Sequence, residues 1–356
     1  MDAIRGIAVS EKVDFIITAC TDQALLTVAR VSEELGLPCY IDYKTALNVT
    51  NKQYMKKVFQ ENDIPTAKHT IMGEFDESKI EGMNYPLIVK PVDCNSSKGV
   101  KKVANSEELK GAVEVAVEYS RTNTAVVEEF ISGEELSADI YVENGVAKLL
   151  SISTLDKIPN NDKFVIFIVF YSYEKTEKVR PVVEKIAQQI ADAFNLKNSP
   201  MLIQMIYDGE KAFVLEFSAR TGGGVKFLLI KKATGFDVIS AVIDLTLGKL
   251  PELSAIKPEN KFIANEFIYC YPGKFEKLDG FEELKADGTI SDYYLFKWKG
   301  AVLDSVDNSG DRIAGFTIQA DNMEELKFKH ITAVDNMKVF DDIGNNIMRK
   351  DLLEVF

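Results

Sequence analysis

The sequence predicts an α/β unit at the N-terminus, followed by α+β domains and a small, mostly β C-terminal domain. Residues 13–19 and 38–41 are short apolar segments typical of strands. Between them, Asp22 to Leu35 has the apolar spacing of a helix and ends before Gly36 and Pro38. After residue 65 short strand-like segments dominate, and 356 residues are enough for two or three packed units.

The later elements follow from apolar periodicity and from chain-breaking residues. Helices are expected at Lys52 to Asn62, Ser106 to Tyr119, Glu174 to Phe194 and Asn322 to Asn336. Strands are expected at residues 85–91, 99–104, 124–131, 135–142, 146–154 and 164–171, and in two segments on either side of Asp208-Gly209.

Composition and charge exclude several functions. The chain is 46% hydrophobic and 27% charged, as in ordinary globular proteins. Its 42 Lys and Arg against 55 Asp and Glu give a net charge of −13, so we expect neither nucleic acid nor a membrane surface as partner. The four cysteines are widely spaced with no CxxC pair, and no signal-peptide pattern is evident, which favours a cytoplasmic location.

Only two histidines, His69 and His330, occur, and they lie far apart in the sequence. Ser-His-Asp catalysis and a His-rich zinc site therefore have little to build on. Any chemistry must use carboxylates, lysines, arginines and backbone amides.

The most informative segment is PMLIQMIYDGEKAFVLEFSA, two apolar strands around a turn. Strand alternation places Glu216 and Ser218 on one face. A three-residue connection would set Gln204 opposite Glu216, whereas a two-residue Asp208-Gly209 loop would put Gln204 out of phase unless a bulge restored it. The three oxygen-bearing side chains would then converge near Arg220 as a ligand set suited to Mg²⁺. The alternative is a solvated strand face, against which the apolar neighbours of Glu216 argue.

A second candidate is Lys90 with the polar segment Asp93 to Gly99 after it. Small residues between two strands let backbone N–H groups approach phosphate, and lysines add charge. An ordinary hairpin loop is the alternative. The nucleotide signatures GxxxxGK[ST] and GxGxxG are absent.

A third candidate is VVEEFISGEE. The backbone at Glu128 to Ile131 could hydrogen-bond a purine edge, and Glu135 could accept from ribose hydroxyls. An exposed acidic turn is the alternative.

In this order the motifs resemble those of ATP-grasp enzymes, from about residue 13 to the C-terminus. NKQYMKKVFQENDIPT is similar to the helix that leads into the family's domain, and YPLIVKP with SSKGV to its phosphate lid. VEEFISGEE is similar to the adenine and ribose strand, and LEFSARTGGG to the metal strand, the catalytic arginine and a Gly-rich substrate turn. The resemblance implies four domains: a short α/β unit (1–50), a small lid region (51–120), a central nucleotide and metal domain (121–250) and a closing domain (251–356).

The same resemblance implies roles for individual residues. Phosphate contacts are expected from Lys52, Lys90 and the closing loop with Ser96, Ser97, Lys98 and Gly99. Adenine would be bound by the backbone of Glu129 and Ile131 with the Glu128 side chain, and ribose by Glu135. Two Mg²⁺ ions, with Mn²⁺ as an alternative, would be held by Gln204, Glu216 and Ser218, with Glu216 bridging. Arg220, Lys90 and Arg312 are the expected catalytic residues.

In this family ATP phosphorylates a carboxylate, and an amine attacks the acyl phosphate. The resemblance therefore implies an ATP-dependent carboxylate-amine ligase acting on an amino acid or another small carboxylate. A carbamoyl-phosphate-synthase-like or carboxylase-like phosphorylating enzyme and a non-catalytic ATP-binding module are the alternatives. Ser218 stands where the family usually has Asn. The N-terminal unit is shorter than usual, and we expect a second subunit to cover its exposed sheet edge in a homodimer.

Overall fold

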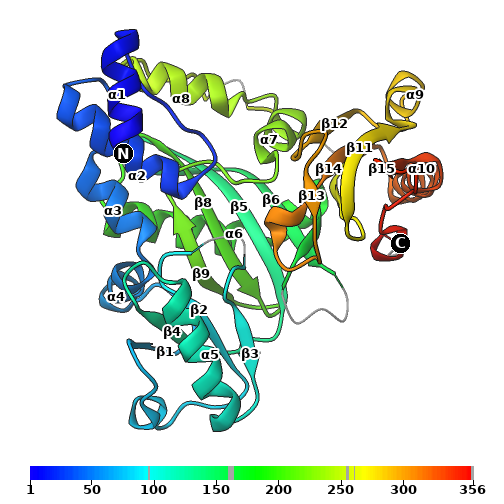
Figure 1. Ribbon diagram of the computed structural model, residues 1–356. Coiled ribbons are helices and arrows are strands. Elements are labelled where there is room, and N and C mark those ends of the chain that lie inside the picture. Colours follow the sequence, from blue (N-terminus) through cyan, green and yellow to red (C-terminus); the bar gives the residue numbers. More distant parts are fainter. Residues whose placement is uncertain (95–96, 159–163, 254–255, 260, 354–356) are drawn as a thin grey trace. The chain divides into compact units, whose positions relative to one another are not determined.

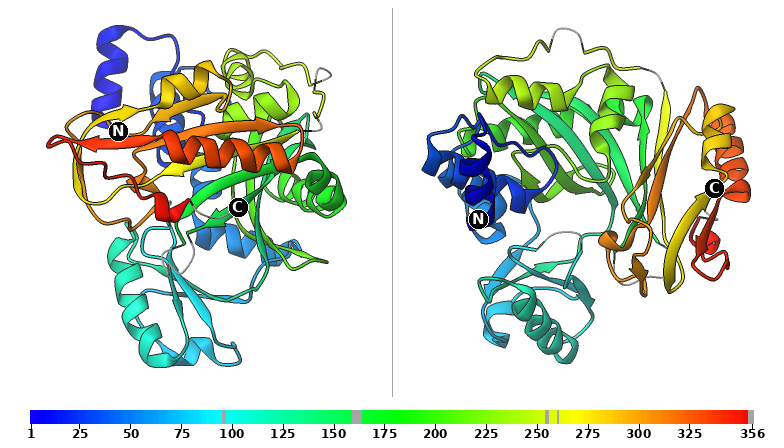
Figure 2. Two further views of the ribbon diagram at one scale, coloured as in Figure 1. Left: turned by 90° about the vertical axis from the view of Figure 1, so that its right-hand side faces the viewer. Right: turned by 45° about the horizontal axis from the view of Figure 1, so that its top comes forward.

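The computed structural model describes the chain except residues 95–96, 159–163, 254–255, 260 and 354–356. The chain forms two compact units, each drawn from separate stretches of sequence (Figures 1 and 2). Unit 1 comprises residues 1–71, 128–152 and 174–259, and unit 2 comprises residues 72–127, 153–173 and 260–356. These stretches differ from the four successive ranges expected from the sequence, which stay a prediction.

Unit 1 is a sheet with helices packed against it. Its strands are β5 (Glu134–Glu143), β6 (Val146–Lys157, in this unit as far as Ile152), β8 (Ser199–Tyr207) and β9 (Ala212–Ser218), in the order β6-β5-β8-β9. Its helices are α1 (Asp2–Glu11), α2 (Asp22–Leu35), α3 (Tyr43–Thr50), α4 (Lys52–Glu61), α6 (Tyr173–Ala193), α7 (Lys226–Thr234) and α8 (Val238–Thr246). The described strand pairings are antiparallel.

The core of unit 1 explains which face of the sheet carries function. Ile140, Ile203 and Phe217 belong to one buried cluster with the apolar sides of α4 and α6. Because successive side chains of a strand point to opposite faces, their neighbours Asp139 and Gln204 point to the other face. That second face carries most of the polar side chains discussed below.

The predicted strands at 13–19 and 38–41 are wrong. Residues 1–50, all of which the structure describes, contain α1, α2 and α3 but no strand. A strand needs a neighbour for its ladder, and these segments instead make single contacts at the end of β9: the Ala19 carbonyl accepts from the Thr221 N–H at 3.0 Å, and the Tyr40 hydroxyl donates to the Ala219 carbonyl at 3.0 Å. Residues 1–50 therefore form no sheet edge for a second subunit to cover. The homodimer stays a prediction, but that edge no longer supports it.

Unit 2 contains a small sheet in the order β1-β4-β2-β3, formed by β1 (His69–Met72), β4 (Ala125–Glu129), β2 (Leu87–Pro91) and β3 (Lys101–Val103). Helix α5 (Ser106–Tyr119) covers one face of this sheet, and Leu109 and Val113 of the helix share a buried cluster with Leu87 and Val89. The helix has the bounds predicted from its apolar spacing.

The remainder of unit 2 is mostly β. Strands β7 (Ile166–Ser172), β10 (Phe262–Ile268), β14 (Ala314–Ala320) and β12 (Asp292–Leu295) pair in that order, and β7 also pairs with β6 from Ser153 on. Strands β13 (Val302–Leu303), β11 (Gly273–Asp279) and β15 (Lys338–Asp341) form another sheet, and α9 (Phe281–Ala286) and α10 (Met323–Asn336) complete the unit. Helix α10 packs on β10 and β14 (Figure 2). Within the described ranges no helix is both long and apolar enough to cross a bilayer.

His330 of α10 holds the C-terminal segment of unit 2. Its Nδ1 lies 2.8 Å from Glu266 Oε2, and its Nε2 lies 2.8 Å from the Leu353 carbonyl. Because a carbonyl only accepts, Nε2 must donate, and the pair then needs a further proton between Nδ1 and the carboxylate. Burial alone would lower the pKa of His330, but the hydrogen bond and charge of Glu266 outweigh it and raise that pKa.

Stability should therefore fall at alkaline pH. A raised pKa in the folded state contributes stability below the unfolded value of 6.5, and this contribution is lost as the pH rises through the folded pKa. Urea unfolding at pH 6 and pH 9 should show a larger loss for the natural protein than for the double variant His330→Gln, Glu266→Gln. Equal losses in the two proteins would contradict this assignment.

Candidate functional site

The β8–β9 hairpin sets the geometry of the site. Gln204 lies directly opposite Glu216, and Ser218 lies opposite Leu202. Neither connection considered from the sequence is the observed one: Tyr207 pairs with Ala212, so residues 208–211 form a four-residue turn. A bulge between the Gln204 and Met205 pairs then shifts the register by one residue. The bulge brings Gln204, Glu216 and Ser218 to one face.

The backbone beside the bulge bonds to another segment. The Val214 N–H donates to the Pro65 carbonyl at 2.7 Å, and the Val214 carbonyl accepts from the Thr66 hydroxyl at 2.7 Å. The Lys56 ammonium adds a longer bond of 3.3 Å to the same carbonyl. Residues 65–66 thus supply partners along β9, which fixes the bulge and protects the strand from further pairing.

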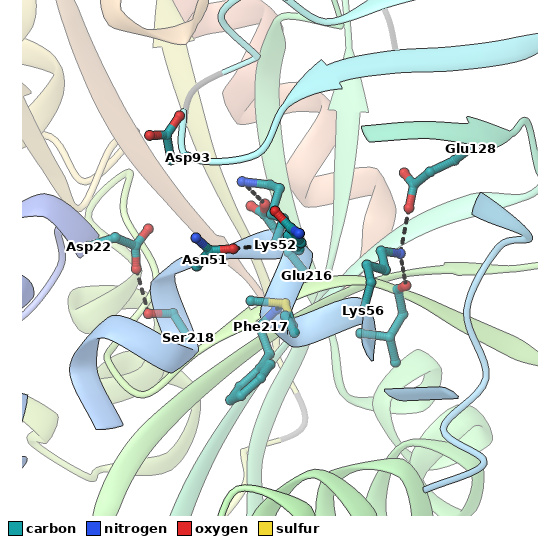
Figure 3. A network of polar contacts seen from close by, with 12 residues as sticks. Asp22, Asn51, Lys52, Lys56, Asp93, Glu128, Glu216, Phe217 and Ser218 are labelled. Carbon is teal, nitrogen blue, oxygen red and sulfur yellow. Dashed lines mark hydrogen bonds and ion pairs between the residues drawn. The ribbon is translucent and has the colours of Figure 1, made fainter. Parts of the chain in front are cut away.

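Glu216 faces a cation from α4. The Lys52 ammonium lies 2.8 Å from Glu216 Oε2, and Lys52 is only 6% exposed (Figure 3). Asn51 caps this helix by accepting from the Gln53 and Tyr54 N–H groups, so Lys52 occupies the first helical position. The Glu216 side chain keeps 31% of its surface exposed. The Lys52 ammonium and the partly exposed Glu216 carboxylate therefore lie together at the end of the β8–β9 hairpin away from its turn.

Asp22 is a site residue that the sequence did not reveal. It is the first residue of α2, and its Oδ1 accepts from Arg220 Nε at 2.7 Å while its Oδ2 accepts from Arg220 Nη2 at 2.5 Å. The Ser218 hydroxyl donates to the same carboxylate (Figure 3). This bidentate pair fixes the plane of the guanidinium. From sequence, an acid at a helix start indicates only a favourable helix terminus.

Burial and charge act in opposite directions at this pair. Burial alone would raise the pKa of Asp22, but the Arg220 charge, with hydrogen bonds from Arg220 and Ser218, lowers it overall. Burial likewise opposes the charged form of Arg220, yet Asp22 and Glu216 raise its pKa. Both groups are therefore ionised over the whole physiological range.

A second buried pair lies one helical turn after Lys52. The Lys56 ammonium lies 2.5 Å from Glu128 Oε1 and bonds to the Thr66 hydroxyl, and neither Lys56 nor Glu128 is more than 2% exposed (Figure 3). Glu128, expected to read adenine, is thus held by an internal cation. Lys56 was not predicted, although its spacing of four residues from Lys52 places both lysines on one helix face.

The other adenine and ribose candidates lie nearby along the chain. The Glu129 N–H donates to the Lys68 carbonyl at 2.9 Å. Ile131 follows β4 and is partly buried, and Glu135 is a partly buried residue of β5.

Lys90 and the predicted lid belong to unit 2. Lys90 lies on β2 and is 8% exposed. Ser96 lies outside the described residues, whereas the Ser97 hydroxyl donates to the Phe164 carbonyl at 3.2 Å and Lys98 is exposed. Gly99 has φ +68°, and a Cβ there would lie 3.0 Å from Pro91 Cγ, so this end of the loop requires glycine.

Arg312 also belongs to unit 2 and is 9% exposed. Its guanidinium stacks 3.6 Å from the centre of the Phe267 ring, and its Nε donates to the Tyr269 hydroxyl at 3.2 Å. Burial lowers the pKa of Arg312, only partly offset by Tyr269. Its catalytic role stays a prediction.

Comparison with known proteins identifies the class. Residues 83–227 match the ATP-grasp domain family. The chain therefore contains an ATP-grasp domain, as its motifs predicted.

Two relatives match most of this chain at low sequence identity. The chain is 22% identical to the carbamoyl phosphate synthase large chain of Clostridium acetobutylicum over 84% of its own length and 29% of that protein. It is 25% identical to the phosphoribosylamine–glycine ligase of Halalkalibacterium halodurans over 74% of its own length and 65% of that protein. The chain thus spans less than two thirds of either relative.

Two solved structures share the fold. An L-amino acid ligase from Bacillus licheniformis superposes with a TM-score of 0.80 at 24% identity, covering 96% of this chain and 84% of the other. The biotin carboxylase domain of a Hydrogenobacter thermophilus 2-oxoglutarate carboxylase, solved with MgADP and bicarbonate, gives 0.76 at 16% identity, covering 99% and 79%. The mixed α/β architecture with antiparallel sheets is therefore the ATP-grasp fold.

Replacing Asp22 should destabilise unit 1. Asp22→Asn removes the hydrogen-bonded counter-charge of the buried Arg220, and breaking such a pair costs about 3–5 kcal/mol. The measurement is urea unfolding, with Asp14→Asn, at an exposed position, as the control.

The same comparison has a definite pH dependence. The folded pKa of Asp22 is lowered, so its contribution is present above the unfolded value of 3.8 and is lost as the pH falls through the folded pKa. A difference between the natural protein and Asp22→Asn that does not shrink under acid conditions would contradict the ion pair.

Proposed function

We propose that this protein is an ATP-dependent carboxylate-amine ligase acting on an amino acid or another small carboxylate. The observation that carries the proposal is the register of the hairpin, which sets Gln204 against Glu216 with Ser218 on the same face. Lys52 and Arg220 flank this face, and the chain contains an ATP-grasp domain. The ligases among the similar proteins make C–N bond formation the favoured reaction for this chain.

The donor set fits a hard divalent cation. Gln204, Glu216 and Ser218 offer amide, carboxylate and hydroxyl oxygens, which Mg²⁺ prefers. The Lys52 ammonium, 2.8 Å from Glu216 Oε2, supports a cation-binding role for this carboxylate. Since Ser218 donates its hydrogen to Asp22, both lone pairs of its oxygen stay available for a ligand. Asp22 thereby offsets the weaker ligand character of serine relative to asparagine.

Two Mg²⁺ ions bridged by Glu216, or Mn²⁺ in their place, are part of the proposal. Bound there, they would neutralise charge on the phosphate oxygens. Lys52, Lys90 and the loop from Ser96 to Gly99 would contact the ATP phosphates. The backbone of Glu129 and Ile131, with the Glu128 side chain, would bind adenine, and Glu135 would bind ribose.

The reaction has two steps. A substrate carboxylate oxygen bonds to the γ-phosphorus while the bond to the β-phosphate oxygen breaks, which releases ADP and leaves an acyl phosphate. The nitrogen of the neutral amine then bonds to the acyl carbon, the bond from that carbon to the phosphate oxygen breaks and releases inorganic phosphate, and one amine proton passes to the phosphate or to solvent. Arg220, fixed by Asp22, would balance charge on the carboxylate and on the tetrahedral adduct. Arg312 is proposed to contact the substrate side.

A cytoplasmic location stays a prediction.

The experiment is a screen of paired amino acids for ADP release by the full chain. Release that needs both an amino acid and an amine supports the ligase. Release that depends on bicarbonate supports the carbamoyl-phosphate-synthase-like or carboxylase-like alternative, which the similarity to that synthase favours. Nucleotide binding without ADP release under any combination supports the non-catalytic module and refutes the ligase.

Glu216→Gln should abolish Mg-dependent ADP release, because it removes the one carboxylate of the ligand set. The expected loss is at least about 10²–10³ in rate. Glu210→Gln, in the exposed turn of the same hairpin, is the matched control and should keep full activity. Turnover retained by Glu216→Gln in a folded protein would remove the metal assignment.

Lys90→Met should weaken ATP binding or slow phosphoryl transfer, because it removes a positive charge from the phosphate site. ATP titration and single-turnover ADP formation are the measurements, and Lys101→Met, at an exposed position on β3, is the control. If Lys90→Met unfolds the protein without any specific effect on nucleotide, Lys90 is structural.

A further inference from the structure

The turn after β9 adopts a conformation that its residues do not favour locally. Gly224 has φ +65°, and Val225 follows with φ 56° and ψ 26°. Glycine enters this left-handed region freely, but a β-branched residue rarely does. Such a residue is strained and keeps its conformation only when its surroundings enforce it.

Lys226, the first residue of α7, follows directly and is held by several polar contacts. Its ammonium lies 2.6 Å from Asp139 Oδ2, 2.9 Å from the Ser137 hydroxyl and 3.3 Å from the Ser137 carbonyl. Lys226 and Asp139 are 3% and 2% exposed, and Ser151 donates to Asp139 Oδ2 at 2.9 Å. All three ammonium hydrogens therefore have acceptors on β5, directly after the strained residue.

The stem of Lys226 also forms the floor of the turn. A Cβ at Gly222 would lie 2.8 Å from Lys226 Cδ and 3.4 Å from Asp139 Oδ1. Two residues earlier, Arg220 donates from Nη1 to the Thr221 carbonyl at 2.8 Å. Thr221 thus connects the turn to Arg220, the residue proposed to contact the reacting carboxylate.

Stability alone does not account for this arrangement. A lysine at the first position of a helix interacts unfavourably with the positive end of the helix dipole. Burial raises the pKa of Asp139 despite the Lys226 charge, which shows how costly the carboxylate is in this place. A pair of apolar residues often replaces a buried ion pair with no loss of stability. What an apolar pair cannot supply is a directed attachment of α7 to β5.

We propose that Lys226 and Asp139 are positioning residues, which hold the Gly222–Val225 turn in its strained conformation and thereby fix Arg220 and the acceptor side of the site. This inference rests on the proposed ligase function. The ligase function alone does not say how the turn is held. The inference adds that the buried Lys226–Asp139 ion pair holds it.

The test is the double variant Asp139→Leu, Lys226→Met, compared with the natural full-length protein. We expect it to fold, with kcat at least tenfold lower and the KM for ATP unchanged within twofold. Adding Val225→Gly should restore part of the lost kcat, because glycine adopts the positive φ without enforcement. An unchanged kcat in the double variant, or a loss of kcat that glycine does not restore, overturns the proposal.

Hydrogen exchange separates this proposal from the ligase assignment. Amides of residues 222–226 should exchange at least tenfold faster in the double variant, whatever the enzyme's activity. If the natural protein shows no ATP turnover but this acceleration is found, the ligase assignment fails and the positioning role stands. If the double variant does not fold, Ser137→Ala, which removes only one acceptor of Lys226, should accelerate exchange at 222–226 over the rest of unit 1. Uniform exchange would overturn the positioning role.

Discussion

A charge removed from water must find an opposite charge nearby, and this requirement organises the polar face of unit 1. Four ion pairs meet it: Glu216 with Lys52, Glu128 with Lys56, Asp22 with Arg220, and Asp139 with Lys226. In three of them one partner is the first residue of a helix, α2, α4 or α7. Asp22 suits the positive end of a helix, whereas Lys52 and Lys226 oppose it, so a carboxylate on the sheet must stabilise each lysine. The helices are thereby attached to the strands that carry the site.

The part of the site that lies within one hairpin was predictable from the sequence. Strand alternation is a local pattern, so Glu216 and Ser218 on one face follow from their spacing of two residues. The alignment of Gln204 with Glu216 depended on the connection, and the sequence did not show that a four-residue turn and a bulge would combine. The partners of these residues were beyond prediction for a different reason. Asp22 is separated from Arg220 by 198 residues, and no local pattern reports a contact of that separation.

The strands predicted at 13–19 and 38–41, which do not form, show a second limit of prediction from sequence. Short apolar segments have the same pattern whether they pair in a sheet or pack as extended connections. Pairing is decided by neighbours elsewhere in the chain. Here the segments contact the end of β9 through Ala19 and Tyr40, and they bring α2 to the position from which Asp22 reaches Arg220. The N-terminal region therefore contributes directly to the site, although it contains no strand.

The turn at 208–211 and the bulge at Leu215 together set which side chains of β9 lie opposite Gln204. Each added or removed residue in a hairpin exchanges the inward and outward sets of side chains. The four-residue turn alone would put the odd-numbered Leu215 across from Gln204, and the bulge reverses this parity. A relative with one residue more or fewer at the tip could therefore keep its chemistry only by losing the bulge. The number of residues in the turn at 208–211 and the presence of a bulge near 215 are therefore expected to change together among relatives.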